Sequence, residues 1–237
     1  MFLVLAAASI PFSYDGALHA GQQLVIRDIL GSVRVRTGDR LAIRATKHAE
    51  RSDPNQVAIR VENRSDGIVV CVRYPADAGR GCADWTAHNV VNDNDTEVDF
   101  DVTVPRGIAL DAASVNGSVD VVNDGPTVAN TINGSVHADA SDVSSANTVN
   151  GSVTVIVRDG RRGALSAHTI NGSVYVTLPP GTGVALEAKT LTGSIHADGV
   201  TVNHPMYGPG ASGHGTVGDG ARVLSLETTN GSITLRR

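Results

Sequence analysis

The sequence predicts an all-β protein, a right-handed β-solenoid or β-roll of stacked repeats of 17 to 21 residues. The main observation is a recurring pattern of Asn, Gly and Ser followed by Val or Ile, whose spacing of about 20 residues is typical of stacked-repeat architectures. Composition agrees: 41% of residues are hydrophobic but only 3% are aromatic, which suits a narrow aliphatic core. The pattern begins at Asn116, Asn133, Asn150, Asn171 and Asn230, with a variant at Thr192.

The residues around each copy form columns of one chemical type. Ser or Thr stands two positions before the first motif residue, and Val or Ile stands three positions after it. Because side chains alternate along a strand, these columns share one apolar face, and stacking would place equivalent residues about 4.8 Å apart. The intervening positions are predicted to face solvent: Asp120, His137, Thr154, Tyr175, His196 and Thr234.

The Asn-Gly pair of each copy is predicted to form a corner of the coil. Both residue types tolerate positive φ, which a sharp corner requires. Asn-Gly between alternating strands is also a strong hairpin signal, so an antiparallel meander or sandwich is the alternative fold. The corner residues are the structural site residues that the sequence identifies: Asn116, Gly117, Asn133, Gly134, Asn150, Gly151, Asn171, Gly172, Gly193, Asn230 and Gly231.

The chain before these repeats is predicted to continue the stack. Residues 24–35 end in a Gly-Ser-Val-x-Val segment and look like a degenerate first copy. Alternation of apolar and polar residues predicts further strands at 41–46, 57–61, 68–72 and 97–104.

The C-terminal part contains a Gly-rich insertion at 199–220, which we expect to be a mobile loop. The final copy, residues 222–237, is predicted to cap the stack with Arg236 and Arg237. Residues 21–237 are therefore expected to form a single β-solenoid domain.

Two features suggest export. The apolar run from Met1 to Ser9 ends in small residues, so residues 1–20 are predicted to be a signal peptide and short leader. The run is too short to span a bilayer. Cys71 and Cys82 are predicted to form a disulfide that staples a loop at 75–96, as cysteine pairs usually do in exported proteins. A redox or metal pair is the alternative, although the spacing is not Cys-x-x-Cys.

Two His-Ala-Asp segments could supply acids and bases. His137 and Asp139 share an outward face, as do His196 and Asp198, but the two pairs are expected three layers, about 14 Å, apart. They cannot converge on one bond or one metal ion. Residues 213–218 match a dinucleotide-binding glycine pattern but lack its strand-to-helix context. We therefore predict no catalytic residue, no cofactor and no metal site.

An acidic stretch from Asp93 to Asp101 could offer oxygen ligands to calcium, but it departs from the EF-hand pattern. Alternation should send Asp99 and Asp101 to solvent, so a solvated acidic strand is the simpler interpretation. A cleft that gathered Trp85, Tyr207 and this stretch would favour glycan binding or catalysis.

The chain resembles the bacterial putative adhesin family, domain of unknown function 4097. The resemblance spans residues 20–237 and rests on the early Gly-Ser-Val-x-Val strand, the Val-x-Val-Pro-x-Gly segment at 102–107, the Asn-Gly repeats, the Gly-rich insertion and the last Thr-x-Asn-Gly-Ser-Ile-x-Leu copy. It implies a β-solenoid at the bacterial envelope. The family has no established catalytic residues to carry over. The cysteine pair and the absence of a basic start to the signal depart from it.

We expect an exported, non-enzymatic, adhesin-like protein that gives a binding or scaffold surface in the periplasm or at the cell surface. An unknown envelope protein or a glycan is the expected partner. The net charge of -5 gives no basic field for nucleic acid. The alternatives are a β-helix enzyme acting on polysaccharide and an envelope-stress signalling partner of a membrane protein.

Overall fold

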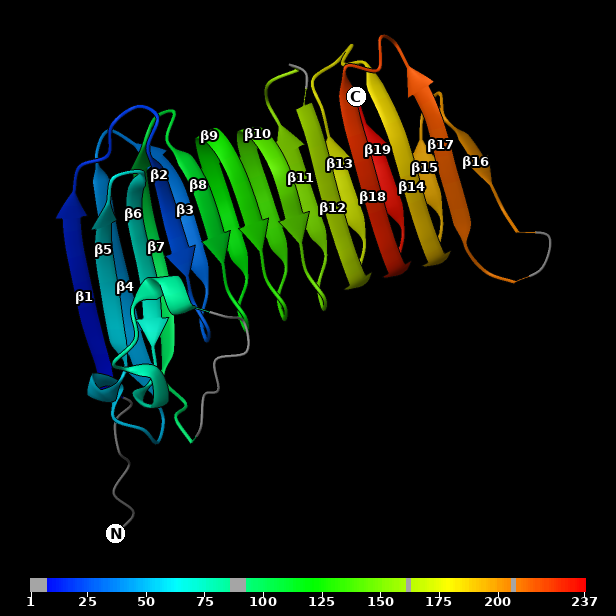
Figure 1. The fold of residues 1–237 in the computed structure, drawn as a ribbon. Coiled ribbons are helices and arrows are strands. Elements are labelled where there is room, and N and C mark those ends of the chain that lie inside the picture. Colours follow the sequence, from blue (N-terminus) through cyan, green and yellow to red (C-terminus); the bar gives the residue numbers. More distant parts are fainter. Residues whose placement is uncertain (1–7, 86–92, 161–162, 206–207) are drawn as a thin grey trace.

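The computed structural model describes residues 8–85, 93–160, 163–205 and 208–237 (Figure 1). Within these ranges the protein is all-β: the strands form one large mixed sheet, mostly parallel, and the helical segments are three short 3₁₀ turns. The predicted all-β class is confirmed. Across the same ranges, no helix has the length and apolar character needed to cross a membrane.

The N-terminal half contains the first nine strands and all three 3₁₀ turns. They are β1 (Ala8–Gly16), β2 (Gln23–Arg27), β3 (Val33–Gly38), β4 (Leu41–Ala49), η1 (Pro54–Gln56), β5 (Ala58–Arg64), β6 (Gly67–Arg73), η2 (Pro75–Asp77), η3 (Cys82–Asp84), β7 (Glu97–Pro105), β8 (Ala109–Ala113) and β9 (Val119–Asn130).

The C-terminal half contains the remaining strands. They are β10 (Val136–Asn147), β11 (Val153–Val157), β12 (Gly163–Asn171), β13 (Val174–Thr177), β14 (Val184–Thr192), β15 (Ile195–Ala197), β16 (Thr201–Asn203), β17 (Ala211–Val217), β18 (Arg222–Asn230) and β19 (Ile233–Arg236).

The strands divide between two faces that run along an elongated stack (Figure 1). The long strands β9 and β10 contribute their first halves to one face and their second halves to the other. Face A consists, in spatial order, of β1, β4, β7, β3, β9, β10, β11, β13, β19 and β15. Face B consists of β5, β6, β2, β8, β9, β10, β12, β18, β14, β17 and β16.

The repeat copies pair in parallel and in register, which excludes the antiparallel meander for the centre of the stack. Asn116 faces Asn133, and Asn133 faces Asn150, at successive corners. Antiparallel pairs occur only towards the two ends of the described sheet, as in β1 with β4 and β14 with β17. A layer is one level of this stack: one strand of face A together with the strand at the same level of face B.

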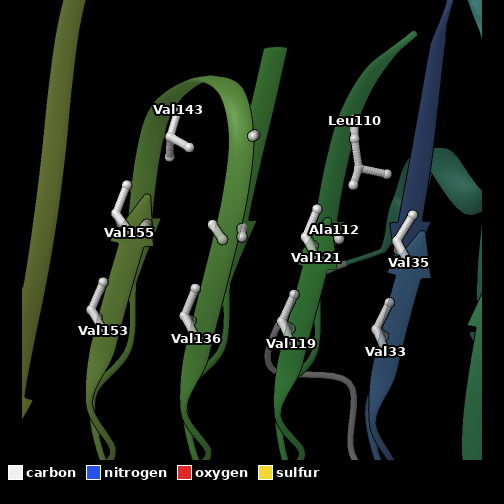
Figure 2. Close-up of a cluster of buried hydrophobic side chains, with 14 of the residues drawn as sticks. Val33, Val35, Leu110, Ala112, Val119, Val121, Val136, Val143, Val153 and Val155 are labelled. Carbon is white, nitrogen blue, oxygen red and sulfur yellow. The ribbon is translucent and has the colours of Figure 1, made fainter. Parts of the chain in front are cut away.

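The predicted apolar columns form the interior. Their side chains are buried, and each valine buried in this way stabilises the fold by about 1.5–3 kcal/mol relative to an exposed one. The predicted solvent-facing residues His137 and Tyr175 are at least partly exposed. Figure 2 shows the valine columns running from layer to layer: Val33, Val119, Val136 and Val153, with Val35, Val121 and Val155 beside them.

The order of layers differs from the order of the sequence at both ends. The first copy, β2 and β3, lies between β6–β7 and β8–β9. The final copy, β18 and β19, lies between β12–β13 and β14–β15, so the C-terminus sits inside the stack (Figure 1). The predicted cap by residues 222–237 is therefore wrong. The final copy carries the same apolar columns as the others, so its strands pair in register with a copy on either side.

Two segments expected to lie outside regular structure belong to the sheet. β1 pairs with β4 along its whole length, and its Phe12 and Tyr14 pack against the core, although residues 1–20 were expected to be signal and leader. The Gly-rich insertion contains β16 and β17, which pair with each other and with β14. This hairpin was not predicted from the sequence, because the alternating glycines of β17 provide no apolar pattern.

Candidate functional site

The motif asparagines form a ladder of side-chain hydrogen bonds along one corner of the stack. Nδ2 of Asn150 donates to Oδ1 of Asn133 at 2.7 Å, and Asn171 donates to Asn150 at 2.8 Å. Asn230 donates in the same way to Asn171. Among the described residues, Asp93 is the only non-glycine residue with positive φ, so the motif asparagines do not adopt the corner conformation that the sequence suggested. Their side-chain amides link the layers instead.

The motif glycines are needed because adjacent layers approach closely at this corner. A Cβ atom on Gly151 would lie 2.2 Å from the carbonyl oxygen of Gly134, well inside van der Waals contact. Gly151 also has a φ of +146°, which side chains disfavour. A Cβ atom on Gly172 would likewise lie 2.0 Å from the carbonyl oxygen of Gly151.

The hydroxyl column before the motif also joins the layers. Oγ1 of Thr148 donates to the carbonyl of Gly134 at 2.8 Å, and Thr169 donates to Gly151 at 2.8 Å. Both threonines are buried, so these bonds satisfy hydroxyls that would otherwise be costly to bury. The geometry of the motif supports a structural role, and the positions outside it are the candidates for binding.

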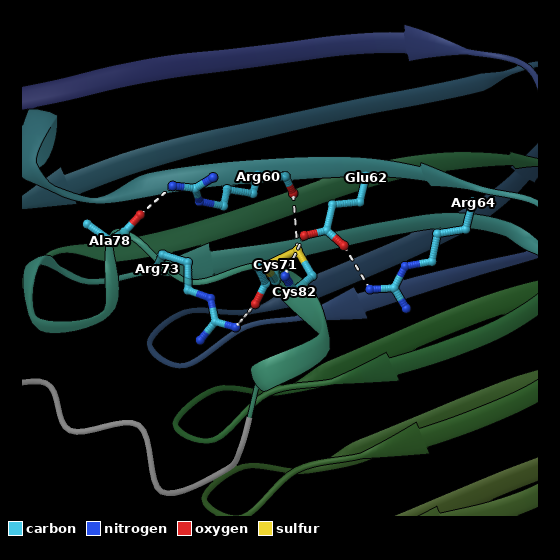
Figure 3. Close-up of a disulfide and its surroundings, with 8 residues drawn as sticks. Arg60, Glu62, Arg64, Cys71, Arg73, Ala78 and Cys82 are labelled. Carbon is cyan, nitrogen blue, oxygen red and sulfur yellow. Dashed lines mark hydrogen bonds and ion pairs between the residues drawn. A yellow bond between two sulfur atoms is a disulfide. The ribbon is translucent and has the colours of Figure 1, made fainter.

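The predicted disulfide between Cys71 and Cys82 is present, with 5.6 Å between the Cα atoms (Figure 3). Cys71 lies on β6, and Cys82 begins η3. The backbone N–H of Cys82 donates to Glu62 Oε1 at 2.6 Å, and the Arg73 guanidinium donates to the carbonyl of Gly81. These contacts hold the segment after β6 against the outside of face B.

Trp85 lies on this outer surface, directly after η3. It packs against the small apolar cluster of Val69, Cys71 and Cys82. The guanidinium carbon of Arg27 lies 5.8 Å from the centre of the Trp85 ring, within the range of cation–π attraction. The disulfide therefore fixes the single tryptophan of the chain beside a charged residue of β2.

Arg27 is also paired with Asp111 on the neighbouring strand β8. Nη1 lies 2.8 Å from Oδ1, and Nη2 lies 2.5 Å from Oδ2, a bidentate arrangement. The two side chains are only 20% and 31% exposed. Each charge is thus neutralised within the surface by its partner.

Two hollows flank the group formed by Arg27, Trp85 and Asp111. One, of about 290 Å³, lies toward β9 and is bordered by Ala113 and Asn130. The other, of about 340 Å³, lies toward β6 and is bordered by Gln23, Arg64 and Asp66. Arg27, Trp85 and Asp111 border both, so the tryptophan stands between two adjacent depressions. The sequence drew attention to Trp85 but missed Arg27, Asp111 and Asn130, because their proximity depends on the order of strands in face B.

The acidic stretch is separate from these hollows. A third hollow, of about 440 Å³, is lined by Arg51, Ser52, Asp93, Asn94 and Asp95 and shares no residue with them. The Asp95 carboxylate accepts the backbone N–H groups of Arg51 and Ser52, and hydrogen bonding, led by Ser52, lowers its pKa. Tyr207 lies outside the described residues. Trp85 and the acidic stretch therefore lie at separate hollows, and this dispersal counts against a cleft shared by the two for glycan binding or catalysis.

The acidic side chains of β7 are on its outer side, as predicted: Glu97 and Asp101 are exposed and Asp99 is partly exposed. His48 on β4 lies 3.1 Å from Glu97 and 3.7 Å from Asp99, with its two ring nitrogens facing the two carboxylates. In the part of the chain that the structure describes, no three His, Cys, Asp or Glu residues are arranged to hold a metal ion.

The two His-Ala-Asp segments are farther apart than the sequence indicated. His137 and His196 are four layers apart, about 19 Å, because the final copy is inserted between them. Asp139 is held by Arg158, with 2.6 Å between its carboxylate and Nε. Gly213 lies within strand β17, which is not the setting of a dinucleotide-binding turn.

One histidine contact was not anticipated. His168 Nε2 on β12 lies 3.2 Å from Ser166 Oγ and 3.5 Å from Ser225 Oγ of β18. Among the described residues, no hydrogen bond joins Nδ1 of His168 to a carboxylate, so the orienting partner of a catalytic triad is not seen there.

The chain matches no family model and no curated protein. Among solved structures it is similar to a putative cell adhesion protein from Clostridium sporogenes, with 14% identity, a TM-score of 0.48 and coverage of 96% of this chain and 99% of that one. It is also similar to a putative adhesin from Bacteroides fragilis, with 10% identity, a TM-score of 0.29 and coverage of 95% and 97%. With TM-scores this low, the likenesses establish no family or function for this chain.

Proposed function

We propose that the protein is an exported, non-enzymatic, adhesin-like β-solenoid that presents a binding surface at the bacterial cell envelope, with the surface around Trp85 as its site. The carrying observation is that Trp85 is fixed by a disulfide between two hollows of an otherwise regular sheet. The stack is inferred to wind with the right-handed sense usual for parallel β connections.

The disulfide and the N-terminus support export. Structural disulfides persist mainly in oxidising compartments such as the periplasm. Cleavage after Ala8, at the end of the Ala-x-Ala segment, would leave Ser9 to Gly16 available to pair with β4. We place the mature chain in the periplasm or at the cell surface, with an envelope protein or glycan as its partner.

The arrangement around Trp85 favours binding over catalysis. Arg27 and Asp111 neutralise each other through two hydrogen bonds, so neither is poised as an acid or base. A glycosidase would require two carboxyl groups across a cleft. Asp111 and Asp66 both border the second hollow, but Asp111 is tied to Arg27, and Asp66 accepts a hydrogen bond from Gln23 at 3.0 Å.

Sedimentation with isolated envelopes tests the proposal. Mature protein would be incubated with membranes and with peptidoglycan sacculi, and release of reducing ends from envelope polysaccharides would be measured in parallel. We expect saturable co-sedimentation with one fraction and no release of reducing ends. Turnover would show an enzyme, and co-sedimentation no greater than that of an unrelated acidic protein would exclude a binding role.

A further inference from the structure

We propose that the two hollows beside Trp85 form a site for a neutral oligosaccharide, a proposal that rests on the binding function above. A sugar ring has an apolar face of C–H groups and a rim of hydroxyls. Its site therefore needs an aromatic surface, fixed hydrogen-bonding groups around it and little net charge. Each of these requirements is met by residues of face B.

The floor of the first hollow arises from one small residue. Ala113 of β8 pairs in register with Arg27 of β2 on one side and with Asn130 of β9 on the other. Arg27 and Asn130 thus lie two strands apart, about 10 Å, with only a methyl group between them. The small side chain of Ala113 borders this hollow together with Trp85.

The aromatic surface is held in place before any ligand binds. Trp85 is half-buried and packs on the disulfide cluster, and the guanidinium of Arg27 lies over its ring. A side chain that is already ordered loses little conformational entropy on binding, which improves affinity. The ring borders both hollows, so two consecutive sugar units could contact the parts of it that Arg27 and the disulfide cluster leave exposed.

Polar groups surround the ring. The Asn130 amide oxygen accepts a hydrogen bond from Asn147 at 2.9 Å, while its Nδ2 donates to none of the described residues. Asp111 has oxygens that can accept further bonds, since each carboxylate oxygen accepts more than one. Gln23 and Asp66 provide similar groups at the second hollow.

The charges identify the class of saccharide. The first hollow is bordered by one cation and one anion, Arg27 and Asp111. The second adds Arg64 and Asp66, again one of each sign. A sulfated, phosphorylated or uronic ligand would meet as many carboxylates as guanidinium groups and would gain little net attraction. Neutral hydroxyl-rich units fit this balance better.

The volumes agree with small units. At about 290 and 340 Å³, the hollows lie at the lower end of the roughly 300–1,000 Å³ typical of small-molecule sites. The site is thus suited to a short stretch of a linear chain lying across β2, β8 and β9.

Binding can be followed directly, because Trp85 is the only tryptophan of the chain. The mature protein would be applied to an array of neutral, sulfated and sialylated glycans, and the strongest neutral binder would be titrated against tryptophan emission. We expect binding to neutral glycans with a saturable emission change. Binding confined to acidic glycans, or to none on the array, would overturn the proposal.

Three variants locate the site. Ala113→Leu should fill the hollow and abolish binding, while Ala164→Leu, at an exposed position of the same face, should leave it unchanged. Asn130→Ala should weaken binding about tenfold, as expected for one lost hydrogen bond. Retained circular dichroism and an intact disulfide would show that each variant folds. Wild-type affinity in both Ala113→Leu and Asn130→Ala would overturn the oligosaccharide site beside Trp85, whereas saturable co-sedimentation of the same variants with envelopes would still show an envelope-binding protein whose site lies elsewhere.

Discussion

Thr192 and Asn230 are hydrogen-bonded through their side chains, with 2.9 Å between Thr192 Oγ1 and Asn230 Oδ1, although 38 residues separate them in the sequence. Asn230 in turn donates to Asn171 at 2.8 Å. The corner ladder therefore runs from Asn171 through the last copy before it reaches Thr192. The C-terminal strands are an internal layer, and several properties of the protein depend on this.

Deleting residues 222–237 should abolish cooperative unfolding, because it removes a layer from the interior of the stack. Leu165 and Leu186 would each lose the neighbouring Leu224, and fully burying a leucine is worth about 1.5–3 kcal/mol. Thermal unfolding followed by circular dichroism measures the effect. Replacing residues 201–217 by a short Gly-Ser linker is the control, since β16 and β17 lie at one end of face B. A truncated chain that unfolds like the wild type would contradict the internal position of β18 and β19.

Replacing Asn171 by Ala should lower the free energy of unfolding by about 1 to 3 kcal/mol. The change removes two hydrogen bonds, one to Asn150 and one from Asn230, each worth roughly 0.5–1.5 kcal/mol. Urea denaturation of both proteins provides the measurement. Asn203→Ala, an exposed residue of β16, is the matched control and should change stability by less than about 0.5 kcal/mol. Equal effects of the two substitutions would show that the ladder contributes nothing.

Replacing both Cys71 and Cys82 by Ser should destabilise the protein by about 2 to 4 kcal/mol, because the cross-link no longer restricts the unfolded chain. Trp85 emission should shift to longer wavelength as the segment after η3 loosens from face B. Urea denaturation monitored by fluorescence reports both changes. Adding reductant should affect the wild type and leave the double variant unchanged. A wild-type emission maximum in the variant would mean that other contacts hold Trp85.

Asp28 gives the stability a pH dependence. It is fully buried, no described residue makes a well-formed hydrogen bond to its carboxyl oxygens, and burial raises its pKa well above the ordinary value. The Ile29 amide offsets part of this, while Asp99 and Glu97 add to it; burial likewise raises the pKa of the nearby Tyr74. The folded state therefore binds this proton more tightly than the unfolded state does.

The Asp28 contribution is fully present below the ordinary carboxyl pKa and is lost as the pH rises toward the raised value. Asp28→Asn cannot ionise, so its stability relative to the wild type should increase over that interval and remain level below it. Urea denaturation across a pH series measures the difference. A constant difference between variant and wild type at every pH would show that Asp28 ionises in the folded protein as it does in the unfolded chain.

The columns could be predicted from the sequence because stacking imposes one residue type on each position. Val119, Val136 and Val153 occupy equivalent places in successive layers, and each must be apolar and of similar size. The disulfide could be predicted because Cys71 and Cys82 are close in the chain and are its only cysteines. Both signals are local or periodic, so they survive without knowledge of the tertiary structure.

The sequence by itself determined the all-β class, the inward columns, the corner positions and the cysteine pair, because these follow from alternation and repetition along the chain. Only the tertiary structure decided the order of the layers, since the columns give each copy a similar apolar face and so do not specify which copies are neighbours. That order places Arg27 and Ala113 beside each other on adjacent strands, and both border the same hollow as Trp85. The candidate binding site is therefore a product of strand order, whereas the motif asparagines are hydrogen-bonded from layer to layer along the stack.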